Sequence, residues 1–322
     1  MKKRYWIFLL VILILGLLII SSINDKNSEE QVIIFANRLS KIPLDVVKML
    51  PSMDDNPPII HSSEYETPIP LNSVINSAGA EDSPFISYDS DTLYFFFTPD
   101  VRIPVEKQLL DGVTGIYASK KINGEWQNAE RIVLQDNNKL ALDGCEFVFR
   151  DLMYFCSARE GYEGINWFKA KFIEGKWRNW ENADIELKTK EYETGELHIT
   201  LDGNELYFHS SRSGGKGGLD IWMSKKVNSE WQTPINLELV NTPSEEGWPY
   251  ITFDGNELWF SKDYGIWRSK KVNGEWQTAE NIISSLAGEP TLDSEGNLYF
   301  VHHFYKNNTM IEADIYVAKK KT

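Results

Sequence analysis

Three glutamates recur at similar places along the chain, each directly before an apolar residue or a proline. They are Glu146, Glu196 and Glu289, and a fourth candidate, Glu246, lies slightly earlier in its own stretch. Two carboxyl groups about 5–9 Å apart supply the acid and the base of glycoside hydrolysis. If the fold gathers these side chains at one mouth, they are candidate catalytic residues of a carbohydrate-active enzyme. The interpretation that we favour is that they accept hydrogen bonds from N–H groups or line a wet channel.

Residues that bind ligands rather than react with them accompany these glutamates. Acids, aromatic rings and a histidine around a concave mouth are typical of carbohydrate sites, and cations in adjoining loops would extend such a surface. For the histidine, a packing or channel-lining role is the alternative. The candidate ligand-binding residues are Glu81, Phe85, His198, Arg212, Lys216, Trp248 and Tyr250.

Motifs for other kinds of chemistry are absent from the sequence. It has no G-x-S-x-G elbow, no P-loop and no dinucleotide-binding fingerprint between a strand and a helix. No His/Asp cluster has the spacing of a metal site, so we predict neither a metal nor a cofactor. The glycine-rich run at 214–218 joins two predicted strands and lacks the helix N-terminus that would hold a phosphate.

A repeated block must position all of these residues. From about residue 81 onward the chain holds five copies of an apolar strand, an Asp-rich turn, a Leu-Tyr-Phe strand, a loop and an Ile-Tyr or Ile-Trp strand. A four-strand unit that repeats every ~40–60 residues is the signature of propeller blades. The Leu-Tyr-Phe elements begin at Leu93, Met153, Leu206, Leu258 and Leu298, and hairpin tryptophans follow at Trp126, Trp177, Trp231 and Trp276.

The residues that recur in every copy differ in their predicted role from those that vary. The recurring tryptophans and tyrosines are predicted to pack between neighbouring blades. In a four-strand meander, the start of the first strand and the loop between the second and third strands emerge on one face. The variable candidates fall there, so that face is the predicted ligand mouth. Its three glutamates are aligned at one position of the repeat, which Ser83 and Trp248 occupy in the other two copies.

The two ends of the repeat region complement each other. Residues 64–76 resemble residues 230–241, which end the third copy, whereas the fifth copy stops before any Glu-Trp strand. We therefore predict that the N-terminal strand completes the fifth blade and closes the ring, which removes sheet edges that invite aggregation. The predicted fold is all-β: a five-bladed β-propeller of four-stranded antiparallel blades over residues 61–322.

The repeat resembles the WD40-like propeller repeat of TolB and tricorn-type proteins. The third copy carries the pattern best, as Asp-Gly-Asn-Glu-Leu-Tyr-Phe-His-Ser-Ser-Arg-Ser-Gly-Gly-Lys-Gly-Gly-Leu-Asp-Ile-Trp over residues 202–222. The resemblance covers roughly residues 64–322 and implies the propeller fold. It implies no single activity, because such propellers serve as protein-binding platforms, as substrate gates and occasionally as enzymes. The second copy departs most from the pattern, which affects its predicted strand register.

The N-terminus predicts a membrane anchor. Residues 1–4 include three cations, residues 5–20 form an apolar run with one glycine, and no small-x-small cleavage site follows. We predict a transmembrane signal anchor over 1–23 and a linker over 24–60, with a short helix near Val32–Ile42. The propeller then lies outside the cytoplasm, at the cell surface or in the periplasm. Cleavage of the segment would make the protein secreted.

The net charge and the cysteine content limit which partners the protein is expected to bind and which cellular compartment it is expected to occupy. A net charge of -14 argues against nucleic acid, which requires a basic surface. Cys145 and Cys156 lie in one predicted hairpin, and an exported location permits a disulfide between them. The alternative is two small buried apolar side chains, because a slip of one residue in register would separate the pair.

The sequence favours a membrane-anchored, extracytoplasmic propeller that acts as a non-catalytic binding platform for an envelope protein or glycan. The first alternative is a carbohydrate-active enzyme that uses carboxylates at the channel mouth. The second is a structural or assembly subunit without a small-molecule site. Separations above about 10 Å between all of the candidate carboxylates would exclude the enzyme.

Overall fold

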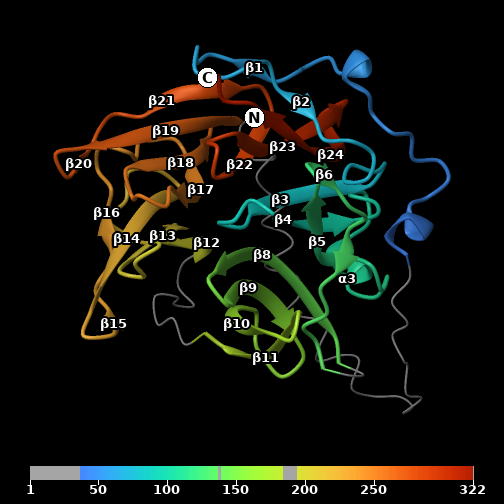
Figure 1. The fold of residues 1–322 in the computed structure, drawn as a ribbon, viewed down its shortest axis with the longest axis horizontal. Helices are drawn as coiled ribbons and strands as arrows, with labels where there is room; N and C mark the ends of the chain where they lie inside the picture. The colour runs from blue at the N-terminus through green and yellow to red at the C-terminus, as the bar shows by residue number, and fades with distance from the viewer. Residues whose placement is uncertain (1–36, 137–138, 184–193, 322) are drawn as a thin grey trace.

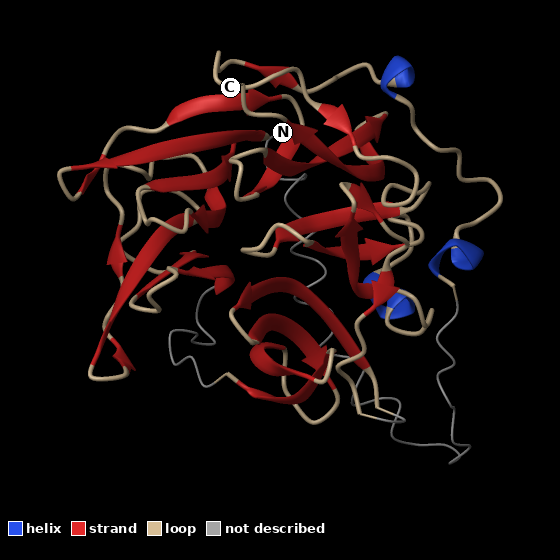
Figure 2. Ribbon diagram, in the orientation of Figure 1, coloured by secondary structure: helices blue, strands red, loops and turns tan. Residues whose placement is uncertain are grey.

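Antiparallel strands make up nearly all of the regular secondary structure in the described part of the chain. The computed structural model describes residues 37–136, 139–183 and 194–321, and its sheets are arranged around a common centre (Figure 1, Figure 2). The helices of these ranges are the 3-10 turns η1 (Arg38–Lys41) and η2 (Pro51–Met53) and the single-turn α3 (Val105–Gln108). The all-β class predicted from the repeat is confirmed.

Each copy of the repeat forms an antiparallel meander. The first copy gives β3 (Ala80–Ile86), β4 (Thr92–Thr98), β5 (Gly115–Ile122), β6 (Glu125–Trp126) and β7 (Glu130–Arg131). The second gives β8 (Ala141–Phe149), β9 (Leu152–Arg159), β10 (Ile165–Ile173) and β11 (Lys176–Asn182). The third gives β12 (Thr194–Ile199), β13 (Glu205–Ser210), β14 (Asp220–Val227), β15 (Glu230–Trp231) and β16 (Ile235–Asn236). The fourth gives β17 (Glu246–Ile251), β18 (Glu257–Lys262), β19 (Gly265–Val272), β20 (Glu275–Trp276) and β21 (Glu280–Ser284). The fifth gives β22 (Ala287–Leu292), β23 (Leu298–Lys306) and β24 (Thr309–Ala318).

The first strands of the meanders close a ring around the centre. β3 contacts β8, β8 contacts β12, β12 contacts β17, β17 contacts β22, and β22 contacts β3 again. A single parallel bridge between Ala313 of β24 and Ala80 of β3 joins the last meander to the first. Antiparallel meanders set radially around such a ring form a β-propeller.

Aromatic residues of the repeat pack between adjacent meanders, as predicted. A hairpin tryptophan of one copy meets the tyrosine of a neighbouring Leu-Tyr-Phe strand at a steep angle, with ring centroids 6.0–6.4 Å apart. Edge-to-face contacts add about 0.5–1.5 kcal/mol to the stability gained from burial. The pairs are Trp126 with Tyr299, Trp177 with Tyr94, and Trp276 with Tyr207.

The N-terminal segment completes the last meander. β2 (Ile69–Pro70) pairs with β24, and Ile69 lies opposite Val317. Tyr65 bridges to Lys320, and its ring meets the ring of Trp259 edge-on at a centroid distance of 6.0 Å. Tyr65 therefore takes the place that a hairpin tryptophan has in other copies. The predicted pairing of the N-terminal strand with the fifth copy is confirmed.

A shared asparagine explains why residues 64–76 resemble residues 230–241. Asn76 donates to the carbonyl of Ile315 and accepts from its N–H group, at 2.9 and 3.0 Å. Asn241 makes the same two bonds with Ile221, both at 2.8 Å. Each asparagine thus ties the end of a meander to its third strand.

Residues 37–60, within the predicted linker, are attached to the propeller. β1 (Ile59–Ile60) pairs with β21 as an additional outer strand. The guanidinium of Arg38 is buried and binds the carboxylate of Glu81. Further along, Lys48 forms ion pairs with Glu312 and Asp314 of β24. These contacts hold the segment against the first, fourth and fifth meanders.

The predicted anchor at 1–23 lies outside the described residues. Within the described ranges, no helix is both long and apolar enough to cross a membrane. The predicted helix near Val32–Ile42 is described only from residue 37 onward, where the chain forms the η1 turn.

Candidate functional site

All five inner strands carry a β-bulge at the same place. The register shifts after Asp82, Gly144, Gly195, Gly247 and Gly288. In each copy a non-glycine residue at this point has a positive φ, a conformation that costs roughly 1–2 kcal/mol. Bulges redirect side chains, and a strained backbone often marks a functional site. The positive-φ residues are Ser83 (49°), Cys145 (55°), Glu196 (38°), Trp248 (53°) and Glu289 (54°).

The bulges correct the predicted alignment of the glutamates. Glu196 and Glu289 do occupy the bulge position, but the second copy has Cys145 there and Glu146 one residue later. Phe147 lies opposite the tyrosine of the Leu-Tyr-Phe strand, a place held in the third copy by the residue two after Glu196. The prediction that all three glutamates are equivalent was therefore wrong for Glu146.

The bulges surround a cavity of about 40 Å³ at the centre of the ring, which we term the axial cavity. No lysine or arginine is among the described residues that line it. The sequence-predicted residues in its lining are Phe85, Glu146, Glu196, His198, Trp248, Tyr250 and Glu289. The others are Ser83, Pro84, Phe147, Leu197, Pro249, Pro290 and Thr291.

Packed rings form much of the cavity wall. The imidazole of His198 lies 4.2 Å from the ring of Phe147, 4.6 Å from Tyr250 and 5.9 Å from Phe85, measured between centroids. Nδ1 of His198 accepts from the N–H of Ile251 at 3.3 Å, and burial lowers the pKa of the ring to about 3. The neutral, buried imidazole agrees with the packing role considered as the alternative for this residue.

Trp248 is the aromatic lining residue that retains partial exposure. Its side chain is half-buried, and its backbone N–H group donates to Nδ1 of His209 at 3.1 Å. The rings of these two residues lie 5.2 Å apart. Trp248 is thus fixed at the mouth with part of its surface available to a ligand.

Three carboxyl groups share the axial cavity in an apolar setting. Both side-chain oxygens of Glu146 are buried without a hydrogen-bond partner, and burial raises its pKa well above the ordinary value. Burial, followed by the charge of Asp82, raises the pKa of Glu196 to about 8. Burial and the charges of Asp82 and Glu196 raise the pKa of Glu289. These groups therefore hold protons more readily than ordinary glutamates do.

Two other predicted acids do not line the axial cavity. Glu81 accepts from the N–H and hydroxyl groups of Ser77 at 2.9 and 2.6 Å and pairs with Arg38. Glu246 accepts from the N–H group of Thr242 at 3.0 Å and from its hydroxyl, and lies 3.5 Å from Lys262. Both carboxylates stabilise loops at the start of an inner strand. Glu246 is therefore no longer a candidate catalytic residue.

The two predicted cations also lie outside the cavity lining. The guanidinium of Arg212 sits 4.7 Å from the ring of Phe208 and 5.3 Å from that of Trp222. The ammonium of Lys216 donates to the carbonyl of Glu238. Both cations thus pack on their own meander.

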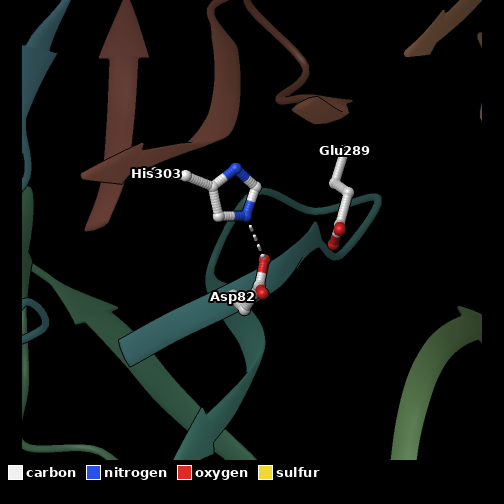
Figure 3. Close-up of side chains that lie close together, drawn as sticks. All are labelled: Asp82, Glu289 and His303. Carbon is white, nitrogen blue, oxygen red and sulfur yellow. Dashed lines mark ion pairs between the residues drawn. The ribbon is translucent and has the colours of Figure 1, made fainter. Parts of the chain in front are cut away.

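The structure gathers an acid–histidine cluster that the sequence did not reveal. Asp82 of β3, Glu289 of β22 and His303 of β23 each present one atom within 4.8 Å of the others (Figure 3). The sequence predicted no metal cluster, because these residues are far apart along the chain. One signal was available in the sequence: the fifth Leu-Tyr-Phe strand continues into the adjacent histidines His302 and His303.

Replacing Glu196 by glutamine tests the shifted ionisation. The ordinary pKa of a glutamate is 4.5, and in the fold that of Glu196 is about 8. The stability contributed by its neutral form is present below pH 4.5 and is lost as the pH rises through about 8. We expect Glu196→Gln to match the wild type near pH 4.5 and to be about 1–3 kcal/mol more stable above pH 8. Urea unfolding in EDTA at both pH values measures this difference.

The exposed Glu125→Gln variant is the control for Glu196→Gln. It should differ from the wild type by the same amount at both pH values. A Glu196→Gln difference that does not change with pH would contradict the shift.

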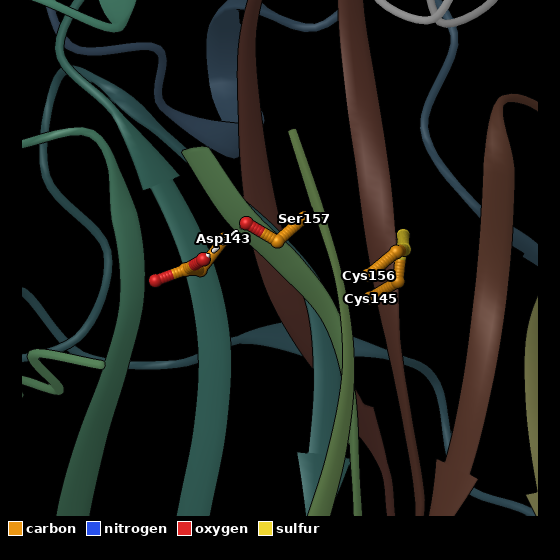
Figure 4. The surroundings of a disulfide bond; sticks show 4 residues. All are labelled: Asp143, Cys145, Cys156 and Ser157. Carbon is orange, nitrogen blue, oxygen red and sulfur yellow. Dashed lines mark hydrogen bonds between the residues drawn. A yellow bond between two sulfur atoms is a disulfide. The ribbon is translucent and has the colours of Figure 1, made fainter. Parts of the chain in front are cut away.

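The bulge of the second copy also holds a disulfide. Cys145 of β8 and Cys156 of β9 are bonded, with their Cα atoms 5.5 Å apart (Figure 4). Gly144 lies directly opposite Cys156, and the extra residue in the bulge brings Cys145 to its partner. The disulfide, one of two alternatives left by the sequence, is the arrangement found.

Replacing both cysteines by alanine should lower the free energy of unfolding by about 2–3 kcal/mol, because the bond restricts a short loop in the unfolded chain. Urea unfolding with and without reductant measures the effect. Reductant should destabilise the wild type and leave the double variant unchanged. Equal wild-type midpoints in both buffers would contradict this expectation.

The chain matches no protein-family model and no curated protein sequence. Among solved structures, it is similar to an endo-arabinase from Bacteroides thetaiotaomicron, with 14% identity and a TM-score of 0.46 over 79% of this chain and 96% of that one. It is also similar to a gluconolactonase from Xanthomonas campestris, with 12% identity and a TM-score of 0.45 over 83% of this chain and 96% of that one. A putative TolB from Agrobacterium tumefaciens has 10% identity and a TM-score of 0.39 over 79% of this chain and 97% of that one. Likenesses of this size assign no activity to the chain.

Proposed function

We propose that the chain is a membrane-anchored, extracytoplasmic platform that binds a protein or glycan of the cell envelope without catalysis. In this proposal its propeller has five blades of WD40-like, TolB-type repeats, one for each inner strand of the ring. The N-terminal strand β2 closes the fifth blade. Residues 1–23 anchor the propeller, and cleavage after them would release it as a secreted protein.

The main observation in support of the proposal is the small volume of the axial cavity. Pockets that enclose small ligands measure about 300–1,000 Å³, whereas this cavity measures about 40 Å³. Packed rings of Phe147, His198 and Tyr250 occupy the space beside it. A ligand of sugar size or larger therefore lies across the mouth, against Trp248 and the neighbouring prolines.

The disulfide supports the extracytoplasmic location. Disulfides persist in oxidising compartments and are rare in the cytosol. Cys145 and Cys156 account for both cysteines of the chain. An acidic chain with net charge -14 also favours partners other than nucleic acid.

Binding and turnover by the full chain test the proposal together. Solubilised envelope glycans and purified envelope proteins are titrated against the protein, and product release is assayed in the same samples. We expect saturable binding without turnover, lost in Trp248→Ala and kept in Tyr88→Ala, which removes an exposed ring away from the cavity lining. Turnover, or binding that Trp248→Ala leaves intact, would contradict the platform.

The carbohydrate-active enzyme is the second candidate, and one observation favours it. Glu146, Glu196 and Glu289 line one cavity, and all three have raised pKa values. A carboxyl group kept protonated beside an acidic partner is the arrangement that a glycosidase uses as its general acid. Hydrolysis of cell-wall or plant glycans that is abolished by Glu146→Gln or Glu289→Gln would establish this alternative.

A further inference from the structure

The cluster of Asp82, Glu289 and His303 has the spacing of ligands around one ion. Nε2 of His303 lies 3.7 Å from Oδ1 of Asp82, which is too long for a direct hydrogen bond. Ligand atoms that each lie about 2.0–2.2 Å from an ion are separated from one another by about 3–4.4 Å. The three groups lie within 4.8 Å of one another, so small side-chain rotations bring them to that spacing.

The fold holds these three groups firmly. They project from β3, β22 and β23, where the last meander meets the first (Figure 3). The side chains of Asp82 and His303 are 13% and 17% exposed, and Glu289 is 6% exposed. The N–H group of Ser83 donates to Oδ1 of Asp82 at 2.9 Å and orients the carboxylate. Binding groups on rigid strands with fixed orientation form more exact sites than groups on loops.

A glutamate outside the cluster also has a buried carboxyl group without hydrogen-bond partners. Glu146 comes from the second meander, is 5% exposed, and neither of its carboxylate oxygens has a hydrogen-bond partner. Oε2 of Glu289 is likewise buried and without a partner. Glu146 and Glu289 line the same cavity, whose described lining contains no lysine or arginine. Buried carboxylates are stable when they are paired or coordinate a metal.

We propose that Asp82, Glu289 and His303 bind one divalent transition-metal ion, Mn²⁺ or Zn²⁺, at the edge of the axial cavity. The imidazole determines this class, because Mg²⁺ and Ca²⁺ prefer oxygen ligands alone. The ion supplies a positive charge to the carboxylates of Asp82 and Glu289, at the edge of a cavity that other acids also line. It ties the fifth meander to the first from the inner side of the ring. This metal centre does not depend on the partner of the platform or on any catalysis.

Calorimetric titration of the EDTA-stripped full chain with Mn²⁺, Zn²⁺, Mg²⁺ and Ca²⁺ tests the proposal. We expect one ion per chain, with Mn²⁺ or Zn²⁺ bound about 100-fold more tightly than Mg²⁺ or Ca²⁺. Asp82→Asn, Glu289→Gln and His303→Gln should each weaken binding by roughly 100-fold, the upper range for loss of a supporting residue. In electron paramagnetic resonance of bound Mn²⁺, the coupling to the imidazole nitrogen should vanish in His303→Gln.

Matched surface changes are the controls for the metal titration. His61→Gln and Asp91→Asn alter an exposed histidine and an exposed aspartate outside the cluster, and both should bind as the wild type does. Circular dichroism identifies any variant that does not fold. If a variant does not fold, the test of the proposal is whether Mn²⁺ bound to the wild type shows coupling to an imidazole nitrogen. Absence of binding at millimolar metal, preference for Ca²⁺ or Mg²⁺, or unchanged affinity in the folded variants would each overturn the proposal.

Discussion

Replacing Tyr65 by alanine should lower the free energy of unfolding by about 3–5 kcal/mol, the usual loss when a large buried ring is removed. Tyr65 is 2% exposed and packs edge-on against Trp259 of the fourth meander. Its backbone bridges to Lys320, so the same residue also joins the two ends of the ring. Urea unfolding followed by tryptophan fluorescence measures the loss.

A change in the same segment provides the control for Tyr65→Ala. Ile69 lies on β2 but is 53% exposed, so Ile69→Ala should change stability by less than about 0.5 kcal/mol. Deletion of residues 61–78 should have a larger effect, since it leaves the edge of β24 unpaired and prone to aggregation. A deletion variant that is monomeric and as stable as the wild type would contradict closure by this segment.

Replacing Arg38 by methionine should also cost about 3–5 kcal/mol, because it leaves a buried carboxylate without its cation. Arg38 is 6% exposed and Glu81 is fully buried, and the guanidinium also donates to the carbonyls of Val74 and Ile75. Burial raises the pKa of Glu81, while Arg38 and the Ser77 hydrogen bonds oppose that rise. Without Arg38, the pKa of Glu81 should rise further, and the loss of stability should be greatest at high pH.

A double-mutant cycle distinguishes the ion pair from the packing of the Arg38 side chain. Glu81→Gln placed in Arg38→Met should recover much of the lost stability, since it removes the unpaired charge. Arg178→Met is the control: its ion pair with Glu174 is exposed and should contribute about 0–1 kcal/mol. Equal losses in Arg38→Met and Arg178→Met would show that burial of the Arg38 pair has no special effect.

The repeat allowed the strands and their closure to be predicted, because both depend on local patterns. Leu-Tyr-Phe runs mark second strands, and the resemblance of residues 64–76 to 230–241 indicated which strand was missing. The bulges were missed, although a glycine directly precedes the positive-φ residue in four of the five copies. Aligning the copies on Gly144, Gly195, Gly247 and Gly288 places Cys145, and not Glu146, at the bulge position.

Two features could not be predicted from the sequence: the cluster at the edge of the axial cavity and the attachment of residues 37–60 to the propeller. Asp82, Glu289 and His303 meet only because the ring brings the first and last meanders together. Arg38 and Lys48 lie in a segment whose mixed composition is typical of a linker, and their partners are acids more than 40 residues away. Contacts between distant charged groups depend on the finished topology, which local periodicity does not encode.

The pairing of β2 with β24 has a consequence for the order of folding. During synthesis β2 emerges early, whereas its partner emerges only after every other meander has been made. The ring therefore cannot close before β24 has been made, and contacts so distant in sequence form slowly. Until then the edge of β24 and the apolar face that Tyr65 covers are open to other chains. Before β2 and β24 pair, folding intermediates of this chain are therefore prone to misassembly, and chaperones that bind extended strands would protect them.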